Sequence, residues 1–162
     1  PTVTAMMKDC HVIFRFVMDW LNEKGFSGPL IVMGRSLGSA SALELAAHYH
    51  NQIDGLIVES GFAYEVPLLR ILGIDVEALG LKEGTGFHNI QKILSFHKPT
   101  LIIHAELDHI IPFADGQALY DASPARDKTF LNIPGANHND IFLRGFSKYM
   151  KAVGELTRKV QI

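Results

Sequence analysis

The sequence predicts an α/β fold of three layers, in which helices cover both faces of a mostly parallel sheet. Two observations predict it. Helical and strand-like hydrophobic patterns alternate along the 162 residues, and the first three expected strands are short and mainly apolar. Continuous apolar strands are typical of parallel sheets buried on both faces, and intervening helices connect such strands. A content of 48% hydrophobic and 20% charged residues fits one globular domain, which we place at residues 1–162.

The first half of the chain contains two helix–strand pairs. Apolar residues recur at helical spacing over residues 4–24, and Gly25 provides a stop. Residues 29–33 form an apolar run flanked by glycines, which predicts a buried strand. Residues 37–49 are rich in Ala and Leu and predict a helix, and residues 53–59 read as the next buried strand.

The second half begins with an irregular stretch and then resumes the alternation. Residues 61–98 contain several glycines and short helical pieces, and we interpret them as an insertion resembling a lid or cap. A third strand is expected at residues 100–105, a helix at 113–121 and a fourth strand at 128–133. Residues 140–160 carry apolar side chains along one helical face and predict a closing amphipathic helix.

Composition narrows the possible partners and the compartment. The net charge of −2 predicts neither a nucleic-acid nor a membrane partner, because phosphate binding needs clustered Lys and Arg. No apolar run reaches the roughly 18 residues that span a bilayer. The single cysteine, Cys10, cannot form an internal disulfide, which fits a reducing compartment, and we expect a cytoplasmic protein. Cys10 lies on the apolar face of the first helix and is expected in the core.

A candidate nucleophile follows the first strand. Residues 34–38 read Gly-Arg-Ser-Leu-Gly and lead directly into a helix. A serine at such a strand-to-helix turn is pushed out toward a substrate, and Gly34 and Gly38 remove Cβ atoms that would clash. The helix N-terminus offers free amide groups, so the N–H of Leu37 is expected to stabilise an oxyanion next to Ser36.

A serine nucleophile needs a base, and the base needs an acid that orients it. Asp108 comes after the third expected strand and His138 after the fourth, where ligand sites of parallel sheets lie. The order Ser, Asp, His is the order expected for this fold. Glu106 and Asp115 are the alternatives for the acid.

Four other histidines are not assigned a catalytic role. His104 and His109 flank the proposed acid and are expected to be structural or supporting. Neither this pair nor the pair His48 and His50 comes with a credible set of metal ligands, so no metal is predicted.

These motifs resemble those of the α/β-hydrolase family, in particular its small single-domain bacterial members of the serine-aminopeptidase-like or esterase-like type. The resemblance covers essentially the whole chain and rests on residues 34–38, 101–112 and 135–138. It implies that Ser36 is the nucleophile, Asp108 the acid and His138 the base. It also implies hydrolysis of an ester, a thioester or a small amide through an acyl-enzyme, without a metal or an organic cofactor.

Other functions stay open. The chain is alternatively a non-catalytic interaction domain or an inactive fragment, because a fold alone establishes no activity. Acyl transfer to an alcohol or amine through the same acyl-enzyme is a third interpretation.

Substrate contacts are expected from the turn and from the irregular segment. Arg35 directly precedes the nucleophile, and we assign it to substrate binding together with Phe62 and Tyr64. The apolar side chains of residues 61–98 either line an acyl pocket or pack as a helical lid over the site. They include Phe62, Tyr64, Leu68, Leu69 and Leu72.

The resemblance also implies that strands precede the nucleophile strand and that a loop rich in His and Gly supplies a second oxyanion donor. No His-Gly-Gly segment occurs in these residues. We therefore expect the C-terminal part of a larger hydrolase fold, with weakened turnover. Residues 30–33 would then form an exposed apolar edge, which invites pairing with another copy of the chain.

Overall fold

The computed structural model describes residues 2–71, 73–80, 82, 84 and 86–161. It contains a four-stranded sheet in the order β1-β2-β3-β4, and all neighbouring strands are parallel. The strands are β1 (Ile31–Arg35), β2 (Gly55–Glu59), β3 (Thr100–Ala105) and β4 (Lys128–Ile133). The helices are α1 (Val3–Glu23), α2 (Gly38–His48), α3 (Glu65–Ile71), α4 (Asn89–Leu94), α5 (Phe113–Ala122) and α6 (Ile141–Val160). The predicted α/β class and parallel sheet are confirmed.

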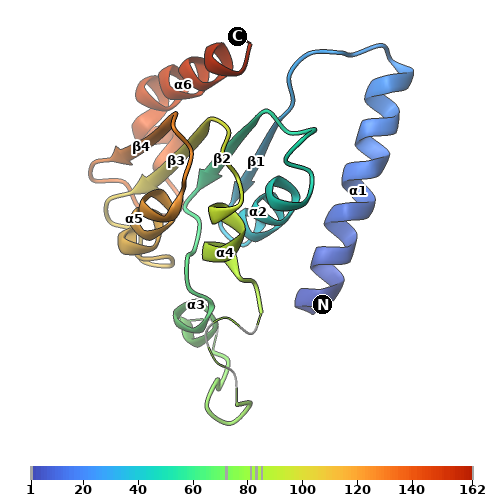
Figure 1. Ribbon diagram of the computed structural model, residues 1–162. Coiled ribbons are helices and arrows are strands. Elements are labelled where there is room, and N and C mark those ends of the chain that lie inside the picture. Colours follow the sequence, from blue (N-terminus) through green and yellow to red (C-terminus); the bar gives the residue numbers. More distant parts are fainter. Residues whose placement is uncertain (1, 72, 81, 83, 85, 162) are drawn as a thin grey trace.

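The sheet is covered by helices on both faces because successive strand side chains point in opposite directions. Leu56 and Val58 of β2 pack with residues of α2, α4 and α5 in one core cluster. Ile57 of β2 and Ile103 of β3 pack with α6 in the other cluster. Figure 1 shows α2, α4 and α5 on one side of the sheet and α6 on the other. The two central strands, β2 and β3, are therefore buried from two sides.

α1 lies beside the sheet next to α2 (Figure 1). Cys10 and Phe14 are buried, as the helical pattern predicts. Two other apolar residues of the helix are not covered: Ile13 is 61% exposed and Trp20 is 44% exposed. The spacing predicted the helix correctly, but only part of its apolar face is covered by the described residues.

β1 is an edge strand of the described sheet, as expected. Its predicted end was Met33, whereas the strand continues to Arg35. The parallel ladder explains the difference, because Arg35 is still in register with Glu59 of β2. Met33 is 48% exposed at this edge.

Two buried carboxylates bind backbone N–H groups of the segment between β2 and β3. Asp115 of α5 accepts hydrogen bonds from the backbone N–H groups of Ala63 and Tyr64. Glu65 of α3 accepts from the N–H groups of Gly86 and Phe87. The role of residues 61–98 as a lid stays a prediction. Among the described helices, none is both long and apolar enough to span a bilayer.

Candidate active site

Ser36, His138 and Asp108 form one hydrogen-bonded row at the carboxyl ends of the strands. The Oγ of Ser36 lies 3.0 Å from Nε2 of His138. Nδ1 of His138 lies 2.8 Å and 3.0 Å from the two carboxylate oxygens of Asp108. Because an ionised carboxylate only accepts hydrogen bonds, Nδ1 carries the proton and Nε2 is left as the acceptor for Ser36. Three residues separated by 72 and 30 positions are thus brought together.

Ser36 occupies the strand-to-helix turn in a left-handed backbone conformation, with φ of 52°. Its N–H donates to the carbonyl of Glu59 at 2.9 Å. A Cβ on Gly34 would lie 2.4 Å from the carbonyl oxygen of Gly38, so the turn requires glycine there. A Cβ on Gly38 would meet nothing within 4 Å, so the expected clash at that position was wrong. Leu37 is the N-cap of α2, where backbone N–H groups have no carbonyl partner within the helix.

Asp108 is held as a carboxylate. Burial by itself raises its pKa, but hydrogen bonds from His138 and from the N–H groups of Ile111 and Ile110 outweigh it. The pKa of Asp108 falls to about 2 as a result. The two alternative acids have other partners: Glu106 accepts from the N–H of Gly135, and Asp115 accepts from the backbone at residues 63 and 64.

His104 is fully buried behind this acid, with Nε2 3.7 Å from Asp108. Nε2 lies 3.0 Å from the carbonyl of Ile111 and serves as its donor. Burial lowers the pKa of His104, which favours the neutral ring. Gly116 leaves room for the ring, since a Cβ there would lie 2.3 Å from Nδ1. His109 is exposed.

Two buried polar residues beside the row were not predicted. Glu59 ends β2 and is 4% exposed, and its carboxylate accepts from Nε of Arg35 and from the hydroxyl of Tyr149. Arg35 also donates to the backbone carbonyl of His138. The sequence does carry one signal for Glu59, because it is the charged end of a strand that is otherwise apolar. Tyr149 lies 90 residues away and carries no such signal.

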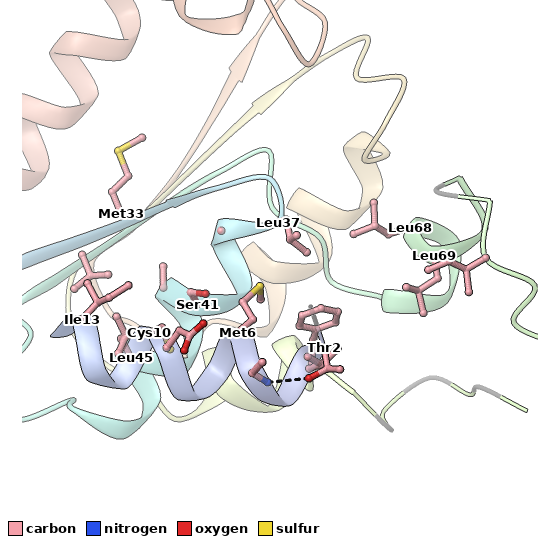
Figure 2. A pocket seen from close by; sticks show the side chains of 18 residues that line it. Thr2, Met6, Cys10, Ile13, Met33, Leu37, Ser41, Leu45, Leu68 and Leu69 are labelled. Atoms are coloured by element: carbon pink, nitrogen blue, oxygen red, sulfur yellow. Dashed lines mark hydrogen bonds between the residues drawn. The ribbon is translucent and has the colours of Figure 1, made fainter. Parts of the chain in front are cut away.

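A groove of about 800 Å³ begins next to Ser36 at Leu37 and runs between α1, β1 and α2. Figure 2 shows Leu37, Leu68 and Leu69 toward one end of it and Ile13 and Leu45 toward the other. The lining is predominantly apolar, and it includes the two leucines that were proposed as pocket residues.

The other described residues predicted to contact substrate do not line this groove. Phe62 does not line the groove, because it is fully buried and packs edge-on against Phe87. Its assignment to substrate binding was therefore wrong, since a side chain with no exposed surface supports the pocket from behind. Tyr64 is half-exposed and lines a smaller cavity beside α4. Arg35 is turned toward Glu59 and the His138 loop. Leu72 lies outside the described residues.

Within the part of the chain that the structure describes, no three His, Cys, Asp or Glu side chains are grouped to hold a metal ion.

No family model matches the sequence. Two curated relatives share about a third of the aligned residues. Alpha/beta hydrolase domain-containing protein 17B of Homo sapiens is 32% identical over 116 residues, which cover 72% of this chain and 38% of that protein. Lysophosphatidylserine lipase ABHD12 of Xenopus tropicalis is 32% identical over 146 residues, covering 78% of this chain and 36% of that protein. The chain thus spans less than two fifths of the length of these relatives.

The fold is also found among solved structures. Est1E from Butyrivibrio proteoclasticus superposes with a TM-score of 0.73 at 20% sequence identity. The superposition covers 99% of this chain and 71% of that one.

Proposed function

This chain belongs to the α/β-hydrolase family, and from that premise we propose that it is a serine hydrolase that cleaves carboxylic esters, thioesters or small amides. The observation that carries the proposal is the continuous row Ser36–His138–Asp108, with contacts of 2.8–3.0 Å. Such a row converts a weakly nucleophilic hydroxyl into an attacking group.

In the first half of the reaction, Ser36 Oγ attacks the carbonyl carbon of the substrate while Nε2 of His138 takes its proton. Asp108 stabilises the imidazolium that forms, and its low pKa keeps it ionised while it does so. Negative charge develops on the carbonyl oxygen, and the N–H of Leu37 at the start of α2 donates to it. Protonation of the leaving group by His138 then breaks the acyl bond and leaves an ester on Ser36.

In the second half, water attacks the acyl-enzyme. His138 removes a proton from the water and returns it to Ser36 Oγ as the second tetrahedral intermediate collapses. The acid product leaves, and the row regains its starting protonation.

The groove next to Ser36 supports an apolar acyl group as the substrate's acid part. Leu37 adjoins the nucleophile and lines the groove, and Leu68 and Leu69 line it toward the same end (Figure 2). One curated relative is described as a lysophosphatidylserine lipase. Both observations favour ester over amide substrates.

A fluorophosphonate probe tests the proposal directly. We expect a covalent adduct that peptide mass spectrometry locates on Ser36, and no adduct in Ser36→Ala. His138→Gln should lower the labelling rate by at least about a thousandfold, because the nucleophile loses its base. Ser27→Ala is the matched control, since Ser27 is exposed between α1 and β1 and does not line the groove. Folded protein that carries no adduct on Ser36 would refute the proposal.

A further inference from the structure

Glu59 links the nucleophile turn to the loop that carries the base. Its backbone carbonyl accepts the N–H of Ser36 at 2.9 Å. Its side chain is almost fully buried and accepts from Nε of Arg35 at 2.9 Å and from the hydroxyl of Tyr149 at 2.6 Å. Glu59 therefore binds the nucleophile turn through its backbone carbonyl, and it binds Arg35 and Tyr149 through its carboxylate.

Arg35 extends this link to the base. Its guanidinium donates through Nε to Glu59 and through a terminal nitrogen to the backbone carbonyl of His138. The planar guanidinium presents its donors at fixed angles, so the carboxylate of Glu59 sets the position of that carbonyl. A lysine at the same place offers one compact point charge and cannot hold both acceptors in a defined geometry.

Tyr149 fixes the other side of the carboxylate. It lies in α6, the helix that directly follows the His138 loop, and is 5% exposed. Burial raises the pKa of Tyr149, and the hydrogen bond to Glu59 and its charge raise it further. The raised pKa favours the protonated phenol, which donates to Glu59.

The arrangement is more specific than packing requires. Well-packed apolar residues often replace a buried ion pair without loss of stability, so a polar set at this place points to a role beyond stability. Its contacts end on the two reacting residues, at the N–H of Ser36 and the carbonyl of His138. We propose that Arg35, Glu59 and Tyr149 form a positioning network that holds the imidazole of His138 in line between Ser36 and Asp108. This inference rests on the proposed function of Ser36 as nucleophile.

The test uses Arg35→Lys and Tyr149→Phe in the full chain, with Tyr49→Phe as the matched control. The hydroxyl of Tyr49 lies 3.1 Å from Nδ1 of His11. This contact joins the end of α2 to α1 and involves no residue of the row. Two quantities are measured: the rate of fluorophosphonate labelling of Ser36 from pH 5 to 9, and the low-field NMR resonance of the His138 Nδ1 proton. The NMR signal reports the hydrogen bond to Asp108 and needs no turnover.

We expect both network variants to label about ten- to a hundredfold more slowly than the wild type, because a misplaced catalytic group costs rate on this scale. Their His138 Nδ1 proton should broaden or exchange away, whereas Tyr49→Phe should match the wild type in both measurements. The network would be overturned if Arg35→Lys labelled at the wild-type rate and its His138 Nδ1 proton resonance were unchanged. This holds whether or not Tyr149→Phe folds. A wild type that does not label would instead refute the proposed nucleophile, and the resonance would still decide the network.

Discussion

Both carboxylate oxygens of Asp108 lie within 3.0 Å of Nδ1 of His138, so the acid holds the imidazole with a two-sided contact. The same carboxylate accepts from the backbone N–H groups of Ile110 and Ile111. It is therefore fixed by the loop in which it lies as well as by its partner. A carboxylate bound in this way orients the imidazole of His138 and also contributes to the stability of the fold.

The first prediction concerns the stability of the fold at low pH. The pKa of Asp108 is lowered from 3.8 to about 2 in the folded protein. A lowered folded-state pKa means that the contribution to stability is complete above about pH 4 and is lost as the pH falls toward 2. This contribution corresponds to roughly 2 kcal/mol in the free energy of unfolding. Urea unfolding of wild type and Asp108→Asn between pH 2 and 6 measures it.

We expect the difference in unfolding free energy between wild type and Asp108→Asn to shrink as the pH falls through this window. Asp19→Asn is the control, because Asp19 is exposed on α1. A difference between wild type and Asp108→Asn that stays constant from pH 6 to pH 2 would contradict the assigned hydrogen bonds.

The second prediction concerns the two glycines of the nucleophile turn. Gly34→Ala should destabilise the protein by about 1–3 kcal/mol, because the new Cβ would lie 2.4 Å from a backbone oxygen and force the turn to move. Gly38→Ala should leave stability unchanged or slightly higher, since the new Cβ meets nothing within 4 Å in a helix. Thermal unfolding of both variants makes the comparison. Equal losses in the two variants would show that the turn is not packed as described.

The sequence was most informative where one local pattern determines the structure. The strands at residues 100–105 and 128–133 have the predicted bounds, and at residues 100–105 a proline directly precedes an apolar run. The positions of Ser36, Asp108 and His138 after the first, third and fourth strands were predicted for a similar reason. Parallel strands place their carboxyl ends at one edge, so residues far apart in the chain meet there.

Features that depend on packing between distant segments were not predictable. Phe62 and Ile13 are both apolar, yet one is fully buried and the other 61% exposed. Helical or loop spacing identifies an apolar side chain but not the element that covers it. The contact between Glu59 and Tyr149 spans 90 residues and depends on how α6 crosses the sheet. No local pattern encodes that crossing.

The third prediction concerns the acyl chain. Leu69→Trp should fill the end of the groove near Leu37 and lower the hydrolysis of p-nitrophenyl decanoate by roughly tenfold, while hydrolysis of the acetate is retained. Leu143→Trp is the control, because Leu143 is 81% exposed on α6 and does not line the groove. Measured kcat/KM values for a series of chain lengths give the comparison. A parallel fall for all chain lengths would exclude the groove as the acyl site.

The fourth prediction concerns the edge of the sheet at β1. This strand has β2 on one side, and its other side is open in the described chain. Met33 in this strand is 48% exposed, and Ile13 of α1, which lines the same groove as Met33, is 61% exposed. We expect copies of this chain to self-associate through β1, because an open apolar edge offers unpaired backbone groups to a second strand.

Met33→Lys should weaken this association at least about tenfold. A twofold symmetric contact brings the same surface of both copies together, so one substitution places two like charges at one interface. Leu94→Lys, at the end of α4 and 50% exposed, removes a similar amount of apolar surface away from the edge and should leave association unchanged. Size-exclusion chromatography with light scattering over a range of concentrations measures the effect. A wild type that stays monomeric throughout, or equal effects of both substitutions, would rule out pairing at β1.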